Sequence, residues 1–65
     1  SLKNFKLDLR TDQGDVVSRI QLLDLGRGGI DRCVSAIVDR VGLPKNVVME
    51  KLKSAELIFY IHEEP

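Results

Sequence analysis

Apolar and charged residues alternate near the start of the chain in a way that predicts a β-strand. Within residues 2–10 the apolar side chains take every second position and the charged ones lie between them: Phe5, Leu7 and Leu9 against Lys6, Asp8 and Arg10. Period-two patterning is typical of a strand with one buried and one solvated face. We therefore expect the charged face of this strand to be exposed to water.

The last strand-like segment, residues 57–62, alternates in the same way but is rich in apolar residues on both faces. One face carries Ile58, Tyr60 and His62, and the other carries Leu57, Phe59 and Ile61. A strand with one wet face does not normally carry two apolar rows. We expect this strand either to be central in the sheet or to present one face to another subunit.

Residues 16–25, VVSRIQLLDL, fit two patterns. If they form a strand, the apolar residues Val16, Ile20 and Leu22 face inward. As a helix they would have Asp15 as N-cap and Gly26 just past the end. We favour the strand, because two strands joined by a short turn that contains Gly14 predict a hairpin.

Two helices are predicted between residues 31 and 54. Asp31 is placed to cap the first, and Gly42 to end it. Its apolar stripe recurs at helical spacing: Val34, Ile37, Val38 and Val41. Pro44 suits the first turn of the second helix. The apolar side of that helix is Val47, Val48, Leu52 and Ala55.

The resulting order, ββααβ, predicts an α+β domain with a small three-stranded antiparallel or mixed sheet and two helices on one face. The alternative order is βαααβ, with residues 16–25 helical. The 65 residues suffice for one small domain, 1–65, which we expect to be excised from a larger protein. A domain of this size buries only about 60% of the surface of its unfolded chain, so a partner or self-association would add stability.

Charge and cysteine content narrow the functional classes. Ten Lys and Arg balance ten Asp and Glu, so the chain lacks the basic excess of most nucleic-acid-binding modules. A single cysteine, Cys33, cannot form an internal disulfide, which favours a reducing, cytoplasmic setting. No apolar run approaches the ~20 residues that span a bilayer, so we expect no membrane association. No metal or cofactor motif is present.

The loop "DLGRGGID" (24–31) contains three glycines and an arginine ahead of the first helix. Its core, GRGG, resembles over four residues the GXXG loop of KH nucleic-acid-binding domains, which would imply a role for Arg27 in binding. The alternative is a plain strand-to-helix corner. Asp24 and Asp31 flank the loop and would repel a phosphate, which favours the corner.

The segment 31–54 resembles the helix-turn-helix of DNA-binding regulators, with its second helix as the recognition helix. Lys45, Asn46 and Lys53 would then contact nucleic acid. Packed helix pairs are also common in proteins that never touch DNA. Nucleic-acid binding through these residues and Arg27 is therefore our alternative function.

Catalysis has little support in the sequence. His62 has no Cys or Ser partner in a recognisable arrangement, and Cys33 lies next to the apolar stripe, as a small buried residue would. We expect a non-catalytic module for protein–protein interaction or oligomerisation, with a protein partner or a second copy as ligand. The expected contact residues are Leu57, Phe59, Tyr60 and Ile61, with His62 at the rim.

Overall fold

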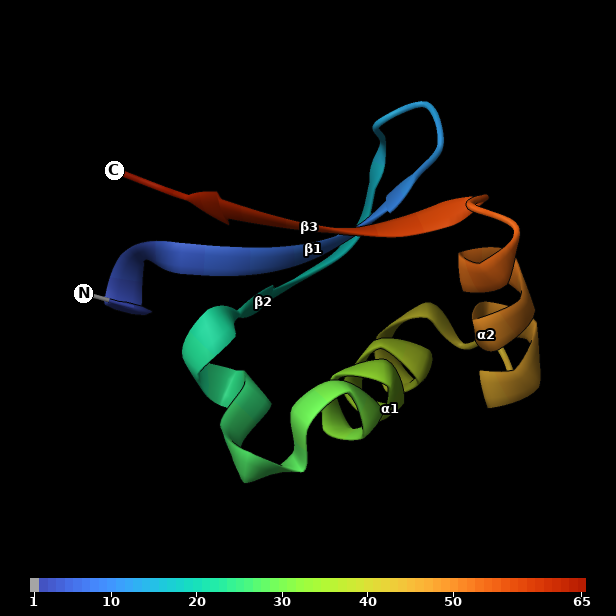
Figure 1. Cartoon of the computed structure of the whole chain (residues 1–65), viewed down its shortest axis with the longest axis horizontal. Helices are drawn as coiled ribbons and strands as arrows, with labels where there is room; N and C mark the ends of the chain where they lie inside the picture. The colour runs from blue at the N-terminus through green and yellow to red at the C-terminus, as the bar shows by residue number, and fades with distance from the viewer. Residues whose placement is uncertain (1) are drawn as a thin grey trace.

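The computed structural model describes residues 2–65, with Arg27 described by its backbone only. In chain order the elements are a 3-10 turn Leu2–Asn4, β1 Phe5–Thr11, β2 Val16–Gln21, a 3-10 segment Leu22–Gly28, α1 Gly29–Val41, α2 Lys45–Lys53 and β3 Leu57–Glu63. The strands form one antiparallel sheet in the order β2-β1-β3, and both helices lie on the same side of it (Figure 1). The predicted α+β class and the order ββααβ are confirmed.

The β1–β2 hairpin contains a bulge that changes which face one residue occupies. Leu9 pairs with Ser18, but Arg10 pairs with Val16, so Val17 is the extra residue. Val16 thereby moves to the face that carries Arg10 and is 47% exposed. The prediction that Val16 points inward is wrong, because it assumed an unbroken period of two.

Residues 16–25 form a strand only in their first part. The strand predicted in preference to a helix is present, but it ends at Gln21, and a 3-10 segment leads on to Gly28. Within that segment Gly26 has a positive φ of +54°, which favours glycine, and the segment is kinked there. Because β2 ends at Gln21, the chain turns away from the sheet earlier than predicted.

The middle of the sheet is formed by β1 and not by β3. β1 pairs with β2 on one side and with β3 on the other, so β3 is an edge strand. One of our two expectations for β3, a central position, is therefore wrong. The apolar residues on both of its faces therefore belong to an edge strand and not to a central one.

Helix α1 ends where predicted but begins earlier. Gly42 takes the left-handed conformation (φ 73°) and its N–H donates to the Val38 carbonyl. The helix starts at Gly29 with Gly28 as N-cap, so Asp31 lies in the first turn and does not cap it. An acidic side chain in the first turn still interacts favourably with the helix dipole. Neither helix in the described part of the chain is long and apolar enough to cross a membrane.

The core lies between β1 and the two helices. Its buried side chains come from β1, α1, α2 and β3: Leu7, Leu9, Cys33, Val34, Ile37, Val48 and Leu57. Burial raises the pKa of the Cys33 thiol, which keeps it protonated and unreactive. The predicted apolar stripe of α1 is thus confirmed as core, with Val38 and Val41 packed at its margin.

Helix α2 ends in a Schellman motif that uses alanine where glycine is preferred. The N–H of Glu56 donates to the Lys51 carbonyl and that of Ala55 to the Leu52 carbonyl. Ala55 has a φ of 60° and is exposed. Its predicted place on the apolar face of α2 is wrong, because the helix ends at Lys53.

Replacing Ala55 by glycine is expected to stabilise the domain. The left-handed conformation costs an L-residue about 1–2 kcal/mol, while the extra freedom of glycine in the unfolded chain offsets about half of the gain. We expect A55G to raise the free energy of unfolding by roughly 0.5–1 kcal/mol, measured by urea denaturation. The same change inside α1, A36G, should lower it, and stabilisation by both variants would contradict this account.

Candidate functional site

The sheet face opposite the helices is open and carries both charged and apolar side chains. Charged and polar groups gather on β1 and β2, whereas apolar ones gather on β3 and at the bulge. The residues of this open face are Lys6, Asp8, Arg10, Val16, Arg19, Gln21, Ile58, Tyr60 and His62. At the centre is Asp8, which pairs across the sheet with Arg19 on β2 and Tyr60 on β3.

Asp8 is fully buried, although it belongs to the charged row that was predicted to face water. Arg19 donates from Nε to Oδ1 (2.7 Å) and from Nη2 to Oδ2 (3.0 Å). Arg10 donates from Nε and Nη2 to Oδ2 at 2.9 and 2.7 Å. The prediction of a solvated row is therefore wrong at Asp8, because two guanidinium groups lie over the carboxylate and exclude water.

The arginines also determine what Asp8 does chemically. The Arg19 guanidinium, with help from Arg10, holds the pKa of Asp8 well below its ordinary value of 3.8, although burial acts in the opposite direction. Asp8 in turn raises the pKa of Arg19. A carboxylate with so low a pKa and both oxygens engaged is a poor proton acceptor. Its role is to fix the positions of the two arginines.

Two aromatic rings complete this cluster. The Arg10 guanidinium carbon lies 4.0 Å from the centroid of the Tyr60 ring, a cation–π contact. The His62 ring lies 5.7 Å from that of Tyr60, and its Nε2 is 3.0 Å from Asp8 Oδ2. Nε2 lies close to this oxygen but is not aligned for a hydrogen bond. The cluster therefore holds Tyr60 and His62 in place on β3.

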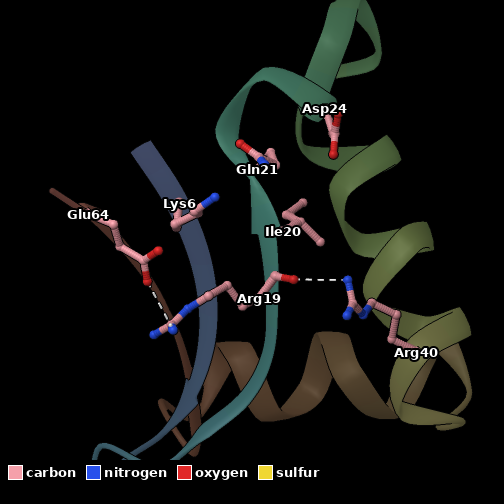
Figure 2. A pocket seen from close by; sticks show the side chains of 7 residues that line it. All are labelled: Lys6, Arg19, Ile20, Gln21, Asp24, Arg40 and Glu64. Atoms are coloured by element: carbon pink, nitrogen blue, oxygen red, sulfur yellow. Dashed lines mark hydrogen bonds and ion pairs between the residues drawn. The ribbon is translucent and has the colours of Figure 1, made fainter. Parts of the chain in front are cut away.

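A shallow, mixed-charge hollow of about 340 Å³ lies beside this cluster, along β2 (Figure 2). Its lining comes from both ends of the chain and from α1: Lys6, Arg19, Ile20, Gln21, Asp24, Arg40 and Glu64. Two of its three cations are already engaged. Arg19 Nη1 lies 3.1 Å from Glu64 Oε1, and Arg40 Nη1 donates to the backbone carbonyl of Arg19 at 2.9 Å.

The contact from Arg40 shows how the β2 edge of the sheet is protected. In an antiparallel pair, alternate residues direct their N–H and C=O groups to the neighbouring strand, and the residues between direct theirs outward. Arg19 is one of the outward residues of β2, and Arg40 of α1 occupies its carbonyl (Figure 2). The bulge at Val17 further interrupts this edge. The β2 edge is thus a poor template for another strand.

Among the residues that the structure describes, none protects the β3 edge in a comparable way. Hydrogen bonds from Asp12 N to Glu56 O and from Glu64 N to Asn4 O mark the two ends of its ladder with β1. The alternation between them turns the backbone groups of the odd residues, Leu57, Phe59, Ile61 and Glu63, away from β1. No side chain of α1 or α2, both described in full, hydrogen-bonds to these groups. β3 runs without a proline, lysine or bulge.

An apolar groove of about 160 Å³ lies next to this edge, on the helix side of the sheet. It is lined by Leu7, Leu25, Ile30, Cys33, Phe59 and Ile61. Its rim is the exposed part: Ile30 is 71% exposed and Ile61 57%. Because these two rim residues are exposed, the groove is open to an apolar side chain approaching along the edge.

The residues predicted to contact a partner are distributed over both faces of β3. Tyr60 is exposed (45%) on the open face, while Ile61 lies on the helix side with Phe59 half-buried beside it. Leu57 is buried in the core, and His62 packs against Asp8. Ile58, which is 39% exposed on the open face, and Ile30 were not singled out. The alternation of Ile58 with Tyr60 in the sequence indicates that the two share a face. The position of Ile30 at the rim of the groove depends on the tertiary structure and has no such signal.

The residues of the alternative function are spread out and show no common site. Lys45 and Asn46 are exposed in the first turn of α2, and Lys53, at its other end, lies 3.6 Å from Glu50. The side chain of Arg27 lies outside the described residues. The KH loop joins two helices and the helix-turn-helix motif includes a third helix, so both resemblances require residues 16–25 to be helical. These residues instead form a strand and a 3-10 segment. Nucleic-acid binding stays a prediction.

Comparison with models of known protein families, with curated proteins and with solved structures finds no match to this chain. Within residues 2–65, no three His, Cys, Asp or Glu side chains are grouped so that they could hold a metal ion. The features that bear on function are the open face, the β3 edge and the adjoining groove.

Proposed function

We propose that this domain is a non-catalytic protein-interaction module that receives an additional β-strand along the free edge of β3. One observation carries the proposal: one edge of the sheet is obstructed and the other is not. Arg40 and a bulge obstruct the β2 edge, whereas the odd residues of β3 direct their backbone groups away from β1, and no side chain of α1 or α2 hydrogen-bonds to them. Natural sheets usually protect an edge that is not meant to pair.

The side chains around β3 support the same function. Strand addition gains affinity from main-chain hydrogen bonds and specificity from pockets for alternate side chains. The apolar groove lies where an inward-facing side chain of the added strand would project, next to Phe59 and Ile61. On the other face, Ile58 and Tyr60 would be covered by the outward-facing side chains of that strand.

Amide hydrogen exchange tests this proposal directly. The probe is a synthetic peptide of sequence LIFYIHE, and the matched control is the same peptide N-methylated at alternate residues, which cannot form the ladder. We expect excess peptide to slow exchange at Phe59 and Ile61, whose amides face outward, with no effect of the control peptide. An edge already occupied in the chain alone would show slow exchange at the same two amides.

Two outcomes would contradict the proposal. Exchange at Phe59 and Ile61 that stays fast under all conditions would show that the edge does not pair. Protection of outward amides on β2, such as that of Arg19, would show that the strand is received at the β2 edge. A mobility-shift assay at low salt, positive for the chain and lost in K45A/K53A, would instead favour the nucleic-acid alternative.

A further inference from the structure

We infer that the strand received by β3 is the β3 of a second copy, paired antiparallel about a two-fold axis at Tyr60. This inference rests on the proposed function and names its partner. Leu57–Glu63 has seven residues, and Tyr60 is the middle one. Only an axis at Tyr60 lets all seven residues of both copies overlap.

The hydrogen-bonding pattern of the free edge fits this axis. Two identical strands related by a two-fold at Tyr60 bring Phe59 opposite Ile61 and Leu57 opposite Glu63 of the second copy. All four residues belong to the odd set whose backbone groups point away from β1. Every outward N–H and C=O of β3 therefore meets a partner, and the same pairing repeats on both sides of the axis.

The side chains brought together are compatible on both faces. On the helix side, Phe59 and Ile61 of the two copies lie side by side and close the open end of the apolar groove. On the open face, Tyr60 lies next to Tyr60 of the second copy, and Ile58 lies opposite His62. The exposed large apolar residues of β3, which are Ile58, Tyr60 and Ile61, are thus all covered by one contact.

Charge does not oppose the pairing. The chain has no net charge, so two copies do not repel each other at long range. The axis places Glu64 opposite Glu56 of the second copy, but each carboxylate has a cation of its own chain nearby. Arg19 lies 3.1 Å from Glu64, and Lys51 lies 3.9 Å from Glu56.

Sedimentation equilibrium from low micromolar to millimolar concentration tests the dimer. We expect the unmodified chain to dimerise, and I61K to weaken dimerisation by at least about tenfold, because the ammonium group would be placed among apolar side chains without a partner. The matched control is V17K, an exposed valine changed to lysine on the opposite edge strand, which should dimerise normally. Circular dichroism establishes that both variants are folded.

A cysteine pair tests the axis. Residues directly opposite in a non-hydrogen-bonded pair bring their Cα atoms to about 4.5 Å, within the Cα separation of about 4.4–6.8 Å that a disulfide requires. Y60C should therefore become a disulfide-linked dimer on mild oxidation, whereas I58C, opposite His62, should not. Cross-linking of I58C without Y60C would overturn the axis at Tyr60.

The experiments distinguish dimerisation through β3 from the receipt of a strand from another protein. A chain that stays monomeric at all concentrations overturns the inference. If Phe59 and Ile61 are still protected by the LIFYIHE peptide, the function as a strand-receiving module survives with a different protein as partner. If the chain is monomeric and the peptide gives no protection, both are overturned.

Discussion

Asp8→Asn is expected to lower the free energy of unfolding by about 2 kcal/mol at neutral pH. The carboxylate is buried and receives hydrogen bonds from Arg10 and Arg19 through both of its oxygens. Asparagine keeps the shape but removes the charge and leaves the two guanidinium groups without their common partner. Urea denaturation measures the loss.

The same substitution should change how stability depends on pH. The pKa of Asp8 is held below its ordinary 3.8 in the folded state, chiefly by Arg19. As the pH falls below that value, the unfolded chain therefore takes up a proton on Asp8 before the folded chain does. The stabilisation from Asp8 is complete above about pH 5 and is lost in acid. In D8N this part of the pH dependence should be absent.

A control separates Asp8 from the other carboxylates. Asp39 is exposed on α1, and D39N should follow the unmodified protein in both stability and its acid dependence. Equal acid sensitivity of D8N and the unmodified protein would show that the Asp8 cluster does not contribute to folding in the way its geometry indicates.

Leu9→Ala is expected to have the largest effect of any single change described for this domain. Leu9 has no exposed surface and lies on the central strand beneath both helices. Removing three buried carbons and leaving a cavity typically costs 2–5 kcal/mol, and we expect about 3 kcal/mol or more here. A chain of this size has only a few kcal/mol of stability in total, so L9A should be largely unfolded at 25 °C.

Far-ultraviolet circular dichroism and thermal denaturation check this expectation. The matched control is L2A, since Leu2 is also a leucine near the start of the chain but is largely exposed. Its effect should stay within about 0.5 kcal/mol. A cooperative thermal transition in L9A close to that of the unmodified protein would contradict the assignment of Leu9 to the centre of the core.

The helices and the strands β1 and β3 could be predicted from local patterns. The stripe from Val34 to Val41 follows the period of a helix, and Gly42 ends it, because both features depend only on neighbouring residues. The alternation in β1 and β3 also predicts which residues share a face. Local patterning was sufficient wherever the structure keeps a regular period.

The candidate site could be predicted only in part, since it depends on strand order and register. Asp8 is buried because Arg19 lies opposite it across the hairpin, a register that the sequence pattern does not specify. The order β2-β1-β3, which makes β3 an edge, is likewise a long-range property. The apolar character of both faces of β3 indicated an unusual strand but could not distinguish a central strand from an exposed edge.

Protection of one edge by Arg40 has a consequence for the size of any assembly. A sheet that can be lengthened at both borders can grow into a fibre, whereas one with a single receptive border stops after one addition. Joining two copies through β3 would leave only β2 at each outer border, and there Arg40 already occupies the Arg19 carbonyl. Arg40, together with the bulge at Val17, thus favours a finite particle over polymerisation.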